Sequence, residues 1–214
     1  MAKIKVFYVN ELRECCYIIY DETSECVIVD PGMQTNDECK RIEKFIDENN
    51  LKPVKLLCTH GHFDHIMGND FVVKKWNIPT YINVNDKKLL ENAEKYFDMF
   101  GYKIPQPPTN TIDLNDNDEV KFGNTILKVI TSPGHTKGGV CFYCDKDNFI
   151  LTGDSLFAGS IGRTDLPGGD YDELMESLLD KVVRVDKDAR VLPGHGPETT
   201  IINELQNNPF LRYE

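Results

Sequence analysis

The chain has 214 residues, of which 40% are hydrophobic and 28% charged, and its formal net charge is −11. This length suits one globular domain, 1–214, that can enclose an apolar core. The negative charge argues against a nucleic-acid or membrane-surface binder, because it repels phosphate groups at long range. No apolar run could cross a bilayer, and the start of the sequence lacks a secretory signal. We therefore expect a soluble, cytoplasmic protein whose oligomeric state the sequence does not determine.

The first residues alternate or run apolar in the manner of strands. This pattern predicts strands at 3–8, 15–20 and 26–29, which together form a β-meander. Asp30-Pro31-Gly32 ends the third strand, and apolar residues on one face then predict a helix at 37–49.

The rest of the chain mixes strands and helices, which indicates an α/β class. A proline-rich stretch at 104–109 predicts a surface loop, because a domain boundary there would divide the candidate site. Further strands are expected at 54–58, 80–84, 119–122, 125–130, 140–143, 149–151 and 190–192, and further helices at 69–76, 86–100, 171–180 and 199–207.

Seven cysteines are present, and most of them lie in apolar strand-like runs. Cys141-x-x-Cys144 has no partner pair of cysteines, so core packing is a better interpretation than a redox or zinc motif. Cys58 lies close to candidate metal ligands, but its place in a strand also predicts a buried thiol. We therefore expect reduced, buried cysteines throughout.

All five histidines lie in short motifs directly after apolar strand-like runs. Histidines used for packing would be scattered, whereas metal ligands must lie where several strand ends converge. In the motif His60-Gly61-His62 the two imidazoles project to the same side of an extended segment and can share one ion. Asp64 and His65 lie beyond the turn, where they can bind a second ion roughly 3.5–4 Å away.

Three more candidate ligands, His135, Asp154 and His195, each follow a different predicted strand. Imidazole and carboxylate ligands together suit zinc, iron or manganese, and the absence of thiolates disfavours a closed structural zinc site. We expect two divalent metal ions, with zinc ahead of iron and manganese.

The series His60-x-His62-x-Asp64-His65, followed by His135, Asp154 and His195, resembles the metallo-β-lactamase superfamily. The resemblance spans most of the chain and implies a four-layer αββα sandwich with the site at one edge. It also implies that the first ion is held by His60, His62 and His135, and the second by Asp64, His65 and His195. Asp154 would bridge the two ions.

Four further segments resemble glyoxalase II-like hydrolases, which cleave hydroxyacylglutathione thioesters. Two-domain glyoxalase II adds a helical domain that supplies much of its glutathione pocket, whereas 19 residues follow His195 here. The chain therefore resembles a shorter, single-domain branch, and its substrate could be another thioester or a small ester. The segments are Pro133-Gly134-His135-Thr136, Thr152-Gly153-Asp154-Ser155-Leu156-Phe157, Gly162-Arg163-Thr164-Asp165-Leu166-Pro167 and Asn208-Pro209-Phe210-Leu211.

This resemblance implies a hydrolase in which two metals share a water, supply hydroxide near neutral pH and polarise the substrate carbonyl. We assign the catalytic roles to Asp64, His62 and His65, and Asp64 could also hold the nucleophile in line.

The candidate substrate contacts have strong structural alternatives. Lys137 could meet an anionic group but also suits a solvated loop. Arg163 could orient the substrate, although a buried ion pair with Asp165 that braces the loop is the favoured interpretation. Tyr143 and Tyr171 are further candidates that the sequence does not rank.

Three other functions stay open at this point. A persulfide dioxygenase would share the motif order but use a single iron, held by His60, His62 or their equivalents, His135 and Asp154. A nuclease or phosphodiesterase would need a positive groove, which the acidic composition disfavours. A structural metal site would be closed to water, whereas ligands on loops predict an open one.

Overall fold

The computed structural model describes residues 1–91 and 110–212, and the first half of that chain forms a six-stranded sheet, sheet A. Its first three strands are antiparallel, as the predicted meander requires, and the remaining strands join it in parallel. In spatial order the strands are β1 (Lys3–Val9), β2 (Glu14–Tyr20), β3 (Glu25–Val29), β4 (Lys52–Leu57), β5 (Thr80–Ile82) and β6 (Thr111–Asp113).

The second half forms another six-stranded sheet, sheet B, and a small hairpin. Within sheet B only the pairing of β10 with β13 is parallel. Its spatial order is β14 (Thr199–Thr200), β13 (Arg190–Pro193), β10 (Phe149–Gly153), β9 (Val140–Cys144), β8 (Thr125–Thr131) and β7 (Glu119–Phe122). The hairpin consists of β11 (Leu156–Phe157) and β12 (Ser160–Ile161).

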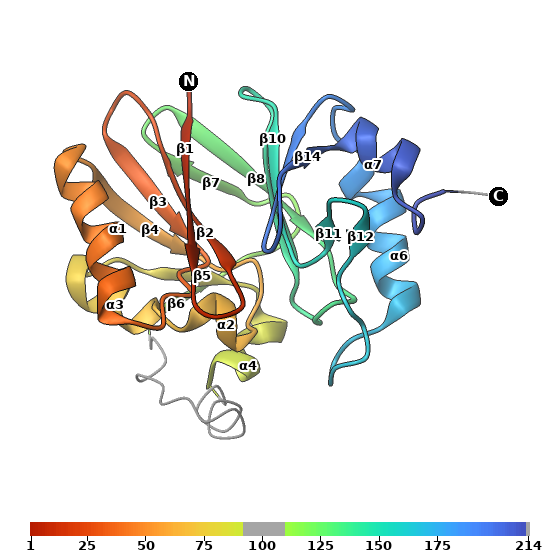
Figure 1. The fold of residues 1–214 in the computed structure, drawn as a ribbon, viewed down its shortest axis with the longest axis horizontal. Helices are drawn as coiled ribbons and strands as arrows, with labels where there is room; N and C mark the ends of the chain where they lie inside the picture. Colours follow the sequence, from red (N-terminus) through yellow and green to blue (C-terminus); the bar gives the residue numbers. More distant parts are fainter. Residues whose placement is uncertain (92–109, 213–214) are drawn as a thin grey trace.

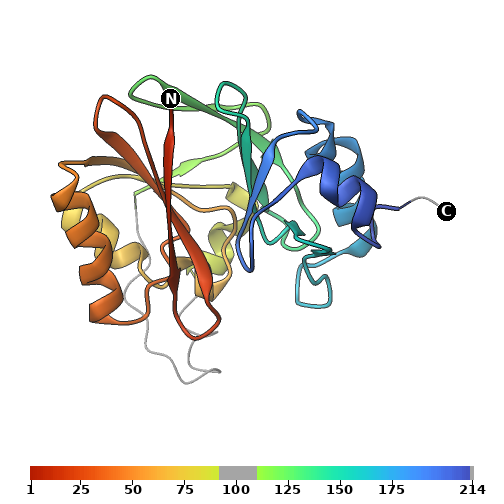
Figure 2. The same ribbon diagram turned by 45° about the horizontal axis from the view of Figure 1, so that its top comes forward.

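Helices cover the outer faces of both sheets, so the layers run helix, sheet, sheet, helix. Both views show α1 (Asn36–Glu48) and α3 (Asn69–Trp76) beside sheet A, and α6 (Tyr171–Asp180) and α7 (Ile201–Asn207) beside sheet B (Figure 1, Figure 2). This is the expected αββα sandwich. The short helices are α2 (Phe63–Ile66), α4 (Lys87–Glu91), η1 (Val84–Asp86) and η2 (Val182–Arg184).

The uninterrupted apolar character of the central strands follows from this layering. In β3, Cys26 and Ile28 pack outward under the helices, while Val27 and Val29 pack inward between the sheets. Successive side chains of a strand point to opposite faces, and here both faces are covered. Ile150 in β10 likewise packs outward against the α6 and α7 side.

Most predicted elements are found within one or two residues of their expected bounds, and the exceptions have local causes. The strand expected at 80–84 ends at Ile82, because Asn83 caps the η1 turn by accepting from the amide of Asn85. The helix expected at 199–207 begins at Ile201, because Thr199 and Thr200 first pair with β13. Of the helix expected at 86–100, the structure describes α4 over Lys87–Glu91, and residues 92–100 lie outside the described residues, as does the loop expected at 104–109.

The cysteines confirm the expectation of packing. All seven are free thiols, and only Cys39 is partly exposed. Cys141 and Cys144 lie in different apolar clusters on opposite faces of β9, and Cys58 is buried under sheet A. Among the described helices, none combines the length and apolar character needed to span a membrane.

Candidate metal centre

The structure brings the seven predicted ligands together at one edge of the two sheets. Each belongs to a loop or short helix that follows a strand, so the ends of four strands meet at this edge. The residues are His60 and His62 after β4, Asp64 and His65 in α2, His135 after β8, Asp154 after β10, and His195 after β13.

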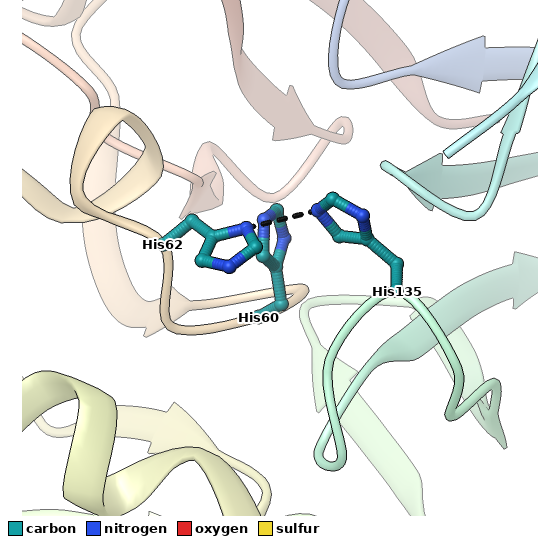
Figure 3. A group of neighbouring side chains, drawn as sticks. All are labelled: His60, His62 and His135. Carbon is teal, nitrogen blue, oxygen red and sulfur yellow. Dashed lines mark hydrogen bonds between the residues drawn. The ribbon is translucent and has the colours of Figure 1, made fainter. Parts of the chain in front are cut away.

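His60, His62 and His135 form the first triad. Their candidate ligand atoms all lie within 4.8 Å of one another, and their rings converge from two loops (Figure 3). Nδ1 of His62 lies 2.9 Å from Nε2 of His135. This donor set of three imidazoles suits one divalent ion.

Asp64, His65 and His195 form the second triad, again with ligand atoms within 4.8 Å of one another. Nε2 of His195 lies 3.1 Å from Oδ2 of Asp64, and Nε2 of His65 lies 3.8 Å from the same oxygen. One carboxylate and two imidazoles thus face a common point beside the first triad.

Asp154 lies between the triads and reaches both. Its Oδ1 is 3.3 Å from Nε2 of His65, and its Oδ2 is 3.5 Å from Nε2 of His135. A register shift in β10 and the positive φ of Gly153 (+47°) aim this residue into the site, and a Cβ at position 153 would lie 2.3 Å from Thr59 Oγ1. The arrangement suits a bridging carboxylate.

Three buried ligand atoms have no hydrogen-bond partner among the described residues, which fits a site built for metal ions. Nε2 of His60, Nε2 of His65 and Oδ1 of Asp154 are buried, and within the described chain none has a hydrogen-bond partner. Buried polar atoms without partners are costly, and bound cations would satisfy all three.

The opposite ring nitrogens are held by the protein, which decides which nitrogen each imidazole presents. Nδ1 of His135 donates to the carbonyl of Arg163 at 2.7 Å, and Nδ1 of His195 donates to the carbonyl of Leu12 at 3.2 Å. Such outer contacts fix the tautomer and orientation of metal-binding histidines. His62 differs, because it presents Nδ1 to the site.

Asp30, which in the sequence marks only the end of the third predicted strand, lies behind the metal ligands and contacts Thr59 and His65. Its Oδ1 accepts from the amide of Thr59 at 2.7 Å, and its Oδ2 accepts from the Thr59 hydroxyl at 2.6 Å and lies 3.1 Å from Nδ1 of His65. The Thr59 hydroxyl in turn lies 3.0 Å from Nδ1 of His60. One carboxylate therefore orients a histidine of each triad, and its position directly after β3 was the available signal.

Glu14 is a second such residue, and no sequence pattern singled it out. Its side chain is fully buried, Oε1 lies 3.8 Å from Nδ1 of His65, and neither oxygen has a hydrogen-bond partner among the described residues. Its backbone forms an isolated β-bridge with His195. Burial raises the pKa of Glu14 well above its usual range, and the charge of His65 only partly opposes this.

The electrostatics of the two triads differ. Burial, together with the neighbouring imidazoles, lowers the pKa of His60 well below its usual range and that of His62 to about 4. Burial also opposes protonation of His65 and His195, but Asp64 and Asp154 outweigh it and raise the pKa of both. The same histidines hold the pKa of Asp154 well below its usual range despite its burial.

A cavity of about 430 Å³ opens onto both triads and offers room for a small substrate. Its walls beyond the candidate ligands are mainly apolar, and Arg163 is their one cationic side chain among the described residues. It is lined by Leu12, Gly61, His62, Phe63, Asp64, Leu89, His135, Asp154, Arg163, Leu166, Pro167 and His195.

The predicted substrate contacts are not all placed at this cavity. Arg163 lines it, but the expected buried ion pair with Asp165 is wrong, because the two side chains are 60% and 69% exposed. A pair between neighbouring residues of one loop is buried only where another element packs over it, and these exposures show that the pair faces solvent. Lys137 and the exposed Tyr171 are not among the lining residues, and Tyr143 donates instead to Asp145 at 3.2 Å.

Comparison with known proteins agrees with the geometry. The family model of the metallo-β-lactamase superfamily matches residues 12–195. The chain is 36% identical over 197 residues to the probable metallo-hydrolase YqgX of Bacillus subtilis, covering 91% of this chain and 90% of that protein. It is 34% identical over 216 residues to the hydroxyacylglutathione hydrolase GloC of Haemophilus influenzae, covering 97% of each.

Solved structures are similar over nearly the whole chain. TTHA1623 in a di-iron-bound form is 34% identical with a TM-score of 0.87, covering 97% of this chain and 100% of that one. The B3 metallo-β-lactamase BLEG-1 is 31% identical with the same TM-score, covering 98% and 99%. Members of this superfamily typically bind two metal ions, as the grouped histidines and aspartates suggest. The chain belongs to the metallo-β-lactamase superfamily and is one of its metallo-hydrolases.

Proposed function

We propose that the protein is a binuclear hydrolase that cleaves thioesters of the hydroxyacylglutathione type. The observation that carries this proposal is the pair of triads joined by Asp154 beneath an open cavity. The similarity to GloC, named a hydroxyacylglutathione hydrolase, supports the substrate class. We expect zinc first, and the di-iron-bound form of TTHA1623 supports iron as the alternative metal.

The ions, when bound, would lower the pKa of a shared water and polarise the substrate carbonyl. The first triad with Asp154 would hold one ion, and the second triad with Asp154 the other. Asp64 lines the cavity with a largely buried carboxylate, so it can accept a hydrogen bond from the attacking water and orient it. No side-chain nucleophile is required.

The cavity walls suggest how a substrate lies. Leu12, Phe63 and Leu89 offer apolar surface to an acyl or thiol chain. Arg163 stands at the same cavity, where it can meet a carboxylate of the substrate in exchange for its exposed pair with Asp165. Partners are thus expected to be small molecules, and seven free thiols suit a reducing, cytoplasmic location.

Elemental analysis of protein purified without added metal, combined with hydrolysis of S-lactoylglutathione, tests this function. We expect close to two ions per chain and thioester hydrolysis in the wild type. His62→Ala should lose both, by more than the roughly 10–100-fold that follows loss of an outer contact to a metal ligand. Lys121→Ala, on an exposed β7 side chain, serves as the matched control and should change neither.

Other results would replace the proposal with a named alternative. A single iron with oxygen consumption on a persulfide would make the protein a dioxygenase. Two ions with turnover of a β-lactam, and no turnover of thioesters, would place its activity with that of BLEG-1.

A further inference from the structure

Asp86 is a buried carboxylate that belongs to neither triad and that the family motif does not include. It ends the η1 turn after β5, at the position where the sequence predicted the first residue of a helix. Its side chain accepts three hydrogen bonds. Oδ2 accepts from the amide of Gly61 at 2.9 Å and from the hydroxyl of Thr136 at 2.7 Å, and Oδ1 accepts from the amide of Gly138 at 2.7 Å.

These three donors all belong to the two loops that carry the first triad. Gly61 lies between His60 and His62, and Thr136 directly follows His135. The first loop follows a strand of sheet A and the second a strand of sheet B, and one backbone hydrogen bond, from the amide of Val140 to the carbonyl of Thr59 at 2.8 Å, joins the segments beside them. The carboxylate of Asp86 is a direct link between the two loops that carry the first triad.

The contacts are too close for any side chain at the two glycines. A Cβ at Gly61 would lie 3.0 Å from the carbonyl oxygen of Asp86 and 2.9 Å from Cβ of Leu89. A Cβ at Gly138 would lie 2.7 Å from Cγ of Asp86. The same segment therefore packs α4, and with it the Leu89 wall of the cavity, directly onto the metal-binding loops.

Metal binding to the first triad depends on the distance between the two loops. Two nitrogens bound to one tetrahedral zinc at about 2.0–2.1 Å are roughly 3.3 Å apart. Nδ1 of His62 and Nε2 of His135 lie 2.9 Å apart here, within about half an ångström of that value. Keeping this separation requires a constraint between the loops, and Asp86 supplies one.

We propose that Asp86 is a positioning residue for the first ion, holding the His62 and His135 loops at the separation which that ion needs. This inference rests on the proposed function, since it presupposes that the first triad binds metal. Asp30 and Asp86 then have different roles. Asp30 contacts His65 of the second triad and reaches His60 of the first through Thr59, whereas Asp86 links the loops on either side of the first triad.

Asp86→Asn is the informative variant. An amide keeps one accepting oxygen and replaces the other by an NH₂ donor, which must then face the amide of Gly138 or the donors Gly61 and Thr136. Outer contacts of this kind typically change metal affinity by 10–100-fold. We therefore expect zinc binding to the first triad to weaken by about 10–100-fold, with binding to the second triad unchanged.

Asp21→Asn is the matched control. Asp21 is also a buried carboxylate, and it accepts from Thr23, Asn124 and Thr125 across two turns. It precedes β3, whereas the metal site lies beyond the other end of that strand. Asp21→Asn should lower stability without changing either zinc affinity.

The measurement is competition between the metal-free protein and a chelator for zinc, with the ring resonances of isotopically labelled histidines reporting each triad. Equal weakening of both triads, wild-type affinity in Asp86→Asn, or the same loss in Asp21→Asn would overturn the inference. If Asp86→Asn does not fold, Thr136→Val removes one of the three donors and should weaken the first triad alone by about tenfold. A wild-type protein that takes up no zinc would instead contradict the proposed function.

Discussion

The two triads should respond differently to pH, because their imidazoles differ in protonation before an ion arrives. The pKa values of His60 and His62 are lowered, the latter to about 4, so both rings are already neutral near pH 7. Burial opposes protonation of His65 and His195 as well, but the nearby carboxylates raise the pKa of both above the usual value for histidine. Binding to the second triad must therefore release protons.

The magnitude follows from proton competition. Below its pKa, each ligand histidine lowers metal affinity about tenfold per pH unit, which is about 1.36 kcal/mol. Two protonated histidines give a factor of up to about 100. Between a pH above these raised pKa values and a pH one unit lower and below them, we expect the second triad to lose zinc affinity by up to this factor, while His60 and His62 impose no such loss on the first.

Zinc titration of the metal-free protein at the two pH values tests this expectation. Calorimetry in two buffers of different ionisation enthalpy counts the released protons, and histidine resonances assign each step to a triad. The sign is specific, because raised pKa values weaken binding as the pH falls. Equal losses at both triads, or binding to the second triad without proton release, would refute the reasoning.

Two further predictions concern the architecture around the site. Gly162→Ala would place a Cβ 1.8 Å from the carbonyl oxygen of Asp154 and 3.1 Å from Nδ1 of His135, so it should cost about 1–3 kcal/mol in urea unfolding and reduce metal content. Gly159→Ala lies in the turn between β11 and β12, and nothing lies within 4 Å of the Cβ that it would add, so it should cost only about 1–2 kcal/mol for its positive φ and keep both metals. An equal loss of metal in both variants would contradict this account. Phe142→Ala should lower the free energy of unfolding by about 3–5 kcal/mol, because the ring is fully buried between the sheets. The control is Ile126→Ala on β8, where the wild-type side chain is 46% exposed, and it should change the free energy of unfolding by about 0.5 kcal/mol or less. Similar losses in the two variants would show that the packing is misassigned.

Local patterns in the sequence were enough to predict most of the elements and the seven candidate ligands. Strand periodicity, apolar runs and the apolar face of a helix depend only on neighbours along the chain. The histidines could be found because each follows an apolar run, a feature that any strand-end site shares.

The outer contacts of the site could not be predicted in the same way. Asp30 and Asp86 act on loops that are distant in sequence, and Glu14 meets His65 only because β2 lies beside β3 in sheet A. The exposure of the Arg163–Asp165 pair likewise depends on what covers the loop rather than on its residues.

The sequence by itself determined the alternation of strand faces, the position of most helices, and the set of residues able to bind metal. The tertiary structure decided which nitrogen each imidazole presents and which carboxylates hold the imidazoles in place. The physical reason is that these properties arise from sheet order and register, which bring together atoms such as Nδ1 of His62 and Nε2 of His135 from different sheets.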